Sequence, residues 1–274
     1  MARWAAYFEV SRSGYYQWKR EKIERTARKA TYGDEVERIF RESQSTYGAE
    51  RISAVLRKNG RSASFKKVAG IMKERGLRSV HVRRTRPLTD SRKARGDGYP
   101  NLLRGMEITA PFLAVSSDIT YIPTDEGFDY LCQIKDIASG VILASCQRER
   151  MTRDLVMDTI RAAHKRWSLP EGCVFHSDRG SQYTSGDVAI LLKKIGLRQS
   201  FSRVGIPGDN AWSESFFSIL KKEAVHGRHF ATRGQARQAI FSFIEVFYNR
   251  VRIQKGLGYF SPIPWLVSVH NFAA

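Results

Sequence analysis

The chain has 274 residues, of which 42% are hydrophobic, so it can bury the core of one large or two modest domains and is not wholly disordered. Its 46 lysines and arginines exceed its 27 acids and give a formal net charge of +19, which favours a polyanionic partner, most commonly nucleic acid. The three cysteines lack the spacing of zinc ligands or of a disulfide framework, and no apolar run is long enough to span a membrane. We therefore expect a cytoplasmic, nucleoid-associated protein with no membrane contact; a basic ribosome-associated protein is the alternative.

The charge is concentrated in the first part of the chain. Residues 1–104 carry 26 basic and 11 acidic side chains, a net charge of +15, whereas residues 105–274 carry 20 and 16, a net charge of +4. The first part is therefore expected to bind phosphates. The second part retains more acidic residues, and acidic residues near DNA are expected to have a specific role.

Apolar residues recur with a helical period through the first 80 residues. The pattern predicts short helices over residues 2–30 around a turn at Ser11–Gly14, and further helices over 33–43, 49–58 and 64–75. Ser64 is expected to cap the last helix, and Gly76 to follow its end. Short helices with basic outer faces are typical of a helix-turn-helix-like module, although any small helical bundle gives a similar pattern. We assign residues 1–80 to a helical, basic DNA-binding region.

Residues 81–108 are predicted to form a basic linker. Residues 81–104 hold six arginines, two prolines and two glycines, with little periodicity. Such a segment either follows a DNA backbone or is a solvated tether, and the sequence leaves both interpretations open.

The pattern of hydrophobic residues changes after the linker, and strands are now predicted as well as helices. Strands are predicted over residues 112–122, 128–134, 140–146, 173–175 and 197–201, and helices over 152–167, 185–195 and 211–224. Three antiparallel strands followed by alternating helix and strand is the order of a ribonuclease H-like α/β fold with a mixed five-stranded sheet. We assign residues 109–230 to this catalytic core and residues 231–274 to a C-terminal helix and tail that complete it.

Three acids stand in positions that suit metal chemistry. Asp118 lies in the middle of a predicted strand, where a charge is costly unless it is paired or binds metal. Asp178 follows a strand, and Glu214 lies in the first turn of a helix, with 35 residues between the two acids. Two divalent ions can activate the attacking oxygen and stabilise the leaving oxygen of a phosphodiester, with Asp118 between them and one acid on either side.

Each acid also has a structural interpretation. Asp118 could be an exposed strand residue, Asp178 a turn former before Gly180, and Glu214 a first-turn acid favoured by the helix dipole. Together, their contexts and spacing favour catalysis, and we expect the three carboxylates to meet in one pocket.

At these residues the chain resembles a known family, the DDE transposases of bacterial insertion sequences, specifically the second-reading-frame (OrfB) product, and its core is similar to retroviral integrases. The resemblance is carried by residues 10–16, 45–52, 117–122, 175–185, 209–223 and 248–262. It covers nearly the whole chain. The family often has tryptophan three residues before the first acid, where this chain has Val115, and the zinc-binding module of retroviral integrases is missing.

The resemblance implies an integrase-like catalytic core with the acidic triad Asp118, Asp178 and Glu214 as catalytic residues and metal ligands, and two Mg²⁺ or Mn²⁺ ions. It implies cleavage at the ends of a mobile element and attack of a 3′-hydroxyl on a second phosphodiester, without a covalent protein–DNA intermediate. The implied partners are double-stranded DNA of the terminal repeats and the target, the first-reading-frame product, and further copies of the chain on DNA.

Basic side chains near the triad are candidate DNA contacts: Lys221, Lys222, His176, Arg252 and Lys255. Lys221 lies two helical turns after Glu214 on the same face, and a solvated lysine is the alternative. A supporting core position is the alternative for His176, and a solvated face for Arg252 and Lys255. Tyr183 and Trp212 are candidates for stacking on a splayed base, with core packing as the default.

Two other functions remain open. A nuclease on the same fold would cut hybrid or branched nucleic acid without joining ends, and a non-catalytic regulator would use only residues 1–80. The complete acidic triad disfavours the regulator, and the basic N-terminal region disfavours the nuclease.

Overall fold

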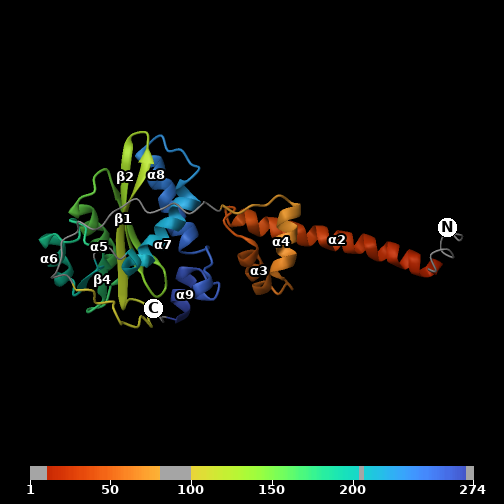
Figure 1. Ribbon diagram of the computed structural model, residues 1–274, viewed down its shortest axis with the longest axis horizontal. Helices are drawn as coiled ribbons and strands as arrows, with labels where there is room; N and C mark the ends of the chain where they lie inside the picture. Colours follow the sequence, from red (N-terminus) through yellow and green to blue (C-terminus); the bar gives the residue numbers. More distant parts are fainter. Residues whose placement is uncertain (1–10, 81–99, 204–206, 270–274) are drawn as a thin grey trace. The chain divides into compact units, whose positions relative to one another are not determined.

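The computed structural model describes residues 11–80, 100–203 and 207–269 (Figure 1). The chain divides into two compact units, Met1–Val80 and His81–Ala274, which are described separately. Most of the predicted linker, residues 81–99, lies outside the described residues.

The described part of the first unit, residues 11–80, contains three helices. They are α2 (Arg12–Glu42), α3 (Ala49–Lys58) and α4 (Phe65–Glu74). Val36 and Ile39 of α2, Ile52 of α3 and Val68 of α4 are almost fully buried and form the small core that holds the helices together. Ser64 caps α4 as predicted, because its Oγ accepts a hydrogen bond from the amide of Lys67.

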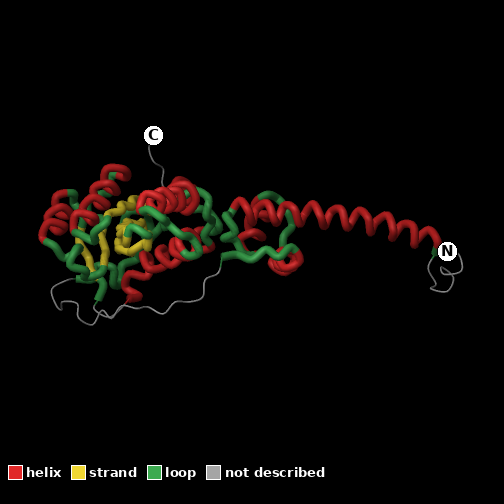
Figure 2. Tube along the Cα trace, turned by 90° about the horizontal axis from the view of Figure 1, so that it is seen from above, coloured by secondary structure: helices red, strands yellow, loops and turns green. Residues whose placement is uncertain are grey.

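The predicted break between two N-terminal helices is wrong. Ser11 caps a single helix of 31 residues, which continues through Gly33. Arg75, the residue that ends α4, crosses the helix at this glycine, where an added Cβ would lie 2.5 Å from the guanidinium, and donates to Asp34, Glu37 and the carbonyl of Ala30. The glycine therefore serves a close approach rather than a helix end. Figure 2 shows the first half of α2 extending beyond α3 and α4.

The second unit contains a mixed five-stranded sheet in the order β3-β2-β1-β4-β5. The strands are β1 (Ala114–Thr124), β2 (Gly127–Asp136), β3 (Ile142–Arg148), β4 (Val174–Ser177) and β5 (Arg198–Phe201). The first three strands are antiparallel, and β4 and β5 run parallel to β1. The predicted α/β class with a ribonuclease H-like five-stranded sheet is confirmed, and the strand ends differ from the prediction by only a few residues.

Helices cover both faces of the sheet (Figure 1). On one face α5 (Arg153–Trp167) and α6 (Gly186–Lys194) supply Leu155, Ile160 and Val188 to the main core, which also contains Val115 of β1. The other face packs against α7 (Ala211–Leu220) and α8 (Arg233–Phe241). Val115 is fully buried, so the position where the family often has tryptophan is a packed core position here.

The end of the second unit is more irregular than one helix and a tail. A π-helical segment (Lys221–Val225) continues α7, and a second one (Ser242–Tyr248) continues α8; a 3₁₀ turn (Lys255–Leu257) and α9 (Pro262–Val269) follow. None of the helices in the described ranges is long and apolar enough to cross a membrane.

Candidate functional site

The carboxylates of Asp118 and Asp178 come from neighbouring parallel strands. Ser116 of β1 lies opposite His176 of β4, and each acid lies two residues further along its own chain segment. Because side chains alternate between the faces of a sheet, Asp118 is directed to the face that carries Ser116, and Asp178 lies just past the adjacent end of β4. Asp178 directly follows the end of β4, at the carboxyl edge of the parallel strands, where α/β sheets bind ligands.

Asp118 is a strongly perturbed carboxyl on the central strand. Its pKa is raised to about 7, chiefly by burial and then by the nearby charge of Asp178, with a smaller contribution from Glu214. The amide of Ile119 donates to Asp118 Oδ1 at 2.8 Å and opposes the rise, as does the ammonium of Lys221. Asp178 and Glu214 are therefore near enough to influence Asp118 electrostatically.

Asp178 and Glu214 remain exposed to solvent. Partial burial raises the pKa of Asp178, against the hydrogen bond that its Oδ1 accepts from the Gly180 amide at 3.1 Å. Partial burial also raises the pKa of Glu214. Both carboxylates can therefore be reached by an ion or a substrate.

Hydrogen bonds to β1 and β2 fix the start of α7, which carries Glu214. Ser213 donates to Ser116 at 3.0 Å and accepts from Nε2 of Gln133 at 2.9 Å. Asn210, the residue before the helix, donates from Nδ2 to the carbonyl of Ser117 at 3.1 Å. These buried side chains hold the first turn of α7 against the strand that bears Asp118.

Lys135 of β2 adds a charged contact to the same helix start. Its ammonium donates to the carbonyl of Trp212 at 3.0 Å. The side chain is almost fully buried, and this burial lowers its pKa to about 8, with the charge of Arg252 acting in the same direction. The sequence analysis overlooked Gln133 and Lys135; the signal was two polar residues that alternate with Cys132 and Ile134 on a strand buried on both faces.

The donor chemistry of the three acids fits hard divalent cations, which prefer carboxylate oxygens. A cation would also offset the repulsion that raises the pKa of Asp118. In residues 11–80, 100–203 and 207–269, however, no group of three or more His, Cys, Asp or Glu side chains is arranged to hold a metal ion. The structure thus brings the acids into electrostatic contact without a closed metal cluster, and their assignment as metal ligands stays a prediction.

Lys221 lies at the end of α7, near Asp118. Its Nζ is 4.8 Å from the ring centroid of Tyr121 on β1. Burial lowers the pKa of Lys221, and the charge of Asp118 opposes that shift. Lys222 is half-buried in the following π-helical segment. Lys221 is thus placed to meet an anion beside the acids.

His176 occupies an interior position that does not suit the predicted DNA contact. The side chain is fully buried, and its two ring nitrogens lie 2.8 and 3.1 Å from the hydroxyls of Ser200 and Ser202. Burial lowers its pKa to about 4, so the ring is neutral at physiological pH. The position agrees with the alternative interpretation, a core histidine that supports the strand before Asp178.

The predicted DNA contact of Arg252 is also inconsistent with its position. Its guanidinium is 3% exposed and makes two hydrogen bonds, of 2.8 and 2.7 Å, to the buried carboxylate of Glu223. A phosphate could reach this group only if the pair opened. Lys255, by contrast, lies exposed in the 3₁₀ turn.

The two predicted stacking residues are core residues. Tyr183 is 1% exposed, and its hydroxyl lies 2.9 Å from that of Ser117. Trp212 is partly buried against Leu103, Ala114 and Val174. Tyr183 is therefore not available to a base in this conformation, and Trp212 is only partly exposed.

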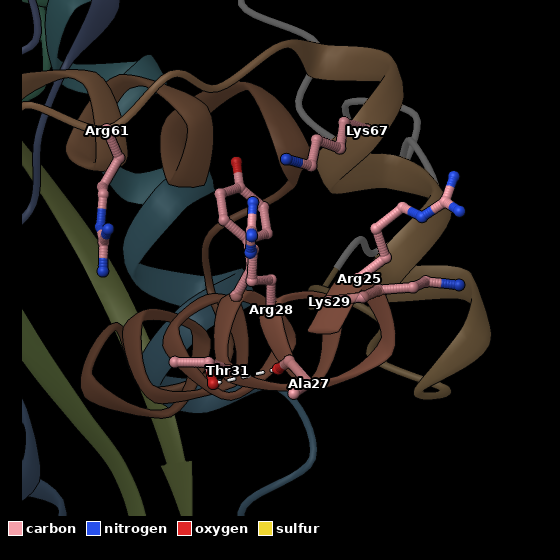
Figure 3. A pocket seen from close by; sticks show the side chains of 8 residues that line it. Arg25, Ala27, Arg28, Lys29, Thr31, Arg61 and Lys67 are labelled. Atoms are coloured by element: carbon pink, nitrogen blue, oxygen red, sulfur yellow. Dashed lines mark hydrogen bonds between the residues drawn. The ribbon is translucent and has the colours of Figure 1, made fainter. Parts of the chain in front are cut away.

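The first unit has a basic groove of its own. It has a volume of about 540 Å³ and is lined by Arg25, Ala27, Arg28, Lys29, Thr31, Tyr32, Arg61 and Lys67 (Figure 3). The ammonium of Lys67 lies 3.9 Å from the ring centroid of Tyr32, whereas Arg61 is paired with Glu35 at 3.2 Å. The figure shows Arg61 and Lys67 reaching in from the side opposite α2. The groove combines cations with an aromatic ring, as phosphate-binding surfaces do.

Comparisons with protein-family models agree with the division of the chain into two units. Two models described as integrase core domain match residues 109–207 and 214–265. One model described as HTH-like domain matches residues 27–85. The two kinds of domain suggest DNA binding, and integrase-core proteins generally depend on divalent metal ions.

Relatives with similar sequences cover almost the whole chain. The chain is 36% identical over 269 residues to the insertion element IS600 uncharacterized 31 kDa protein of Shigella sonnei, across 97% of this chain and 98% of that protein. It is 36% identical over 260 residues to the transposase InsF for insertion sequence IS3A of Escherichia coli (strain K12), across 92% of this chain and 89% of that transposase. The catalytic core domain of BIV integrase is similar in structure, with a TM-score of 0.44 and 19% identity over 58% of this chain and 96% of that one. The identity and coverage of the relatives show that the chain belongs to the insertion-sequence transposases with an integrase core domain.

Proposed function

We propose that this chain catalyses DNA strand cleavage and strand transfer during transposition of a mobile element, with Asp118, Asp178 and Glu214 as its catalytic residues. The observation that carries the proposal is the position of Asp118 on the central strand, where its pKa is raised to about 7 chiefly by burial and further by the nearby charges of Asp178 and Glu214. A buried carboxylate beside two further acids is costly for a fold unless a cation binds there.

The acids would hold two divalent ions, Mg²⁺ or Mn²⁺. Bound ions activate the attacking oxygen and stabilise the leaving oxygen of a phosphodiester. Asp118, whose pKa both other acids affect, would hold the ions together with Asp178 and Glu214. Lys221 faces the same place and would hold a phosphate of the strand being cut. Gln133, Asn210 and Lys135 keep the first turn of α7 in position, and with it Glu214.

Residues 1–80 would bind double-stranded DNA through the basic groove, residues 81–108 would link them to the core, and residues 231–274 would complete the core over 109–230. The support is the match to an HTH-like domain and the cationic lining of the groove. The DNA would comprise the element's terminal repeats and a target at the nucleoid. The first-reading-frame product and further copies of the chain would join the complex on DNA.

A strand-transfer assay tests the proposal. The protein is incubated with labelled duplexes that carry the element's ends and with supercoiled plasmid, in Mg²⁺, in Mn²⁺ and in EDTA, with and without the first-frame product. We expect metal-dependent cuts at the ends and joined products, both absent for Asp178→Asn. Asp187→Asn, a change of a partly exposed acid on α6 that pairs with Arg153, is the matched control and should keep both activities.

Other outcomes would replace the proposal. Cut ends without joined products would support a nuclease. DNA binding that persists while neither cutting nor joining occurs under any condition would support a regulator that uses residues 1–80.

A further inference from the structure

Two aromatic side chains lie exposed beside the candidate site. Tyr121 near the end of β1 is 49% exposed and Phe128 at the start of β2 is 50% exposed. Their ring centroids are 4.9 Å apart, with the ring planes inclined at 59°. They form a continuous aromatic surface in the β1–β2 hairpin, and about half of that surface contacts water, which is unfavourable unless a ligand covers it.

This aromatic pair, Tyr121 and Phe128, is linked to the acids by Lys221, because strand alternation directs the side chains of Tyr121 and Asp118 to opposite faces of β1. Tyr121 is three residues after Asp118 on the same strand, and β4 pairs with β1 only as far as Ser116. Beyond that point the described strands leave the β4 side of β1 open. Lys221 connects the two places, because its ammonium lies over the Tyr121 ring and also interacts with the charge of Asp118.

The hairpin that bears the pair is braced by the C-terminal segment. The side chain of Arg233 donates to the carbonyl of Phe128 at 3.3 Å, and its amide donates to Glu126 at 2.8 Å. The amide of Asp125 donates to the carbonyl of Phe230 at 3.1 Å. The rings are thus held at the surface before any ligand arrives, as a preorganised binding site requires.

We propose that Tyr121 and Phe128 stack on an unpaired base at a DNA strand end, with Lys221 on the phosphate next to that base. The chemistry of the surface selects this occupant. Aromatic rings stack on any base that has left its duplex, because every base has a π face, and a cation beside the rings favours an anionic ligand over an apolar peptide. The inference rests on the proposed function, since strand cleavage and transfer are what bring a strand end to Asp118.

The proposal gives the hairpin a specific task. A terminal base pair is the cheapest to open, and an opened base held on the rings keeps the strand end from closing again. The adjoining phosphate is then free to reach the acids. The pair therefore selects frayed or single-stranded ends over fully paired ones.

A binding experiment with modified ends tests the inference. Three duplexes share one sequence: one is fully paired, one has mismatched terminal pairs, and one has abasic sites in place of the mismatched bases. Asp178→Asn protein in Ca²⁺ keeps the DNA uncut. This protein should bind the mismatched end more tightly than the other two, and Tyr121→Ala and Phe128→Ala should each reduce that preference on the order of tenfold.

Two control variants give the result its meaning. Tyr121→Phe keeps the ring and should keep the preference. Phe241→Ala removes a ring that is 63% exposed on α8 and should change nothing. Circular dichroism melting confirms that each variant is folded.

The inference is overturned if the abasic end binds as tightly as the mismatched end, or if the alanine variants bind all three ends like the parent. Because binding is measured without cleavage, a failure of the proposed chemistry would leave this result standing. Normal strand transfer by the parent without any base preference would reject the aromatic site alone.

Discussion

Asn210 Nδ2 donates a hydrogen bond to the carbonyl of Ser117 at 3.1 Å, and this contact joins the residue before α7 to the residue before Asp118. It connects the helix of the third acid directly to the strand of the first. The side-chain oxygen Oδ1 of Asn210 is buried without a hydrogen-bond partner among the described residues. The buried amide of Asn210 thus makes only part of its possible hydrogen bonds. We infer that its role is to position α7 rather than to stabilise the fold.

Asn210→Ala should therefore reduce metal-dependent strand cleavage by about tenfold or more, as is usual when a group that orients a ligand is removed. The loss should be partly recovered at high Mn²⁺, because Glu214 keeps its chemistry but loses its support. Cleavage rates measured against metal concentration check this. Ser218→Ala, at an exposed position on α7, is the control. Equal rates for the parent and Asn210→Ala at all metal concentrations would contradict the expectation.

The melting temperature of the metal-free protein should respond to the charge of Asp118. Asp118→Asn removes a carboxylate that burial and two neighbouring acids disfavour, so its free energy of unfolding should exceed that of the parent in EDTA. Addition of Mg²⁺ should raise the melting temperature of the parent and leave that of the variant nearly unchanged, since a ligand stabilises only the state that binds it. Thermal melts in EDTA and in Mg²⁺ measure both effects. A variant that melts below the parent in EDTA would speak against repulsion at this site.

Lys135 should give the free energy of unfolding a dependence on pH in the alkaline range. Its pKa is lowered from 10.5 to about 8 in the folded protein, so between these values the unfolded chain binds a proton that the folded chain lacks. The contribution of Lys135 to stability therefore rises as pH rises through this window, by an amount of up to roughly 3 kcal/mol. Denaturant unfolding between pH 8 and pH 10.5 should show a smaller rise for Lys135→Met than for the parent. Parallel pH profiles for the two proteins would disprove the assignment.

The ion pair of Arg252 with Glu223 should matter for stability and not for DNA affinity. Arg252→Met leaves a buried carboxylate unpaired and should cost about 3–5 kcal/mol of unfolding free energy. Arg252→Met combined with Glu223→Leu should recover part of that loss, which a double-mutant cycle measures. The salt dependence of DNA binding should be unchanged in the double variant. A shallower salt dependence of DNA affinity in the double variant would instead support a contact between Arg252 and a DNA phosphate.

Lys67 in the groove of the first unit is expected to meet a phosphate. Lys67→Met should weaken binding to duplexes of any sequence and lower the slope of log affinity against log salt by about one. Titrations over a range of salt concentrations give that slope. Lys193→Met, at an exposed position on α6, removes the same charge and should leave the slope unchanged.

The sequence predicted the sheet well because hydrophobic alternation and turn residues are local signals. The strands from residue 114 to residue 201 fall within a few residues of the predicted ranges. The predicted division between helices over 2–30 and 33–43 is wrong: α2 is continuous through Gly33, where Arg75, 42 positions later, packs against the helix, a contact that has no local signal. The π-helical continuations of α7 and α8 also have no local signature.

In the candidate site, too, the sequence predicted some features and missed others. Asp118, Asp178 and Glu214 stand out because acids in a strand, after a strand and in a first turn are uncommon together. The burial of Arg252 against Glu223 was not visible in the sequence, because their partnership spans 29 positions. Likewise, the exposed surface of Tyr121 follows from the early end of the neighbouring strand, which the alternation pattern of β1 alone does not contain.

The contact of Arg75 with α2 divides that helix into two parts that should behave differently in solution. Before Ala30, no described residue of α2 is buried, and the helix relies on local pairs such as Arg28 with Glu24. An isolated helix of this length is marginal in water. Amide hydrogens should exchange rapidly from residue 12 to about residue 29 and slowly from Asp34 onward. The contact of the Arg75 guanidinium therefore marks the boundary between a part of α2 that unfolds locally and a part that unfolds only with the whole unit.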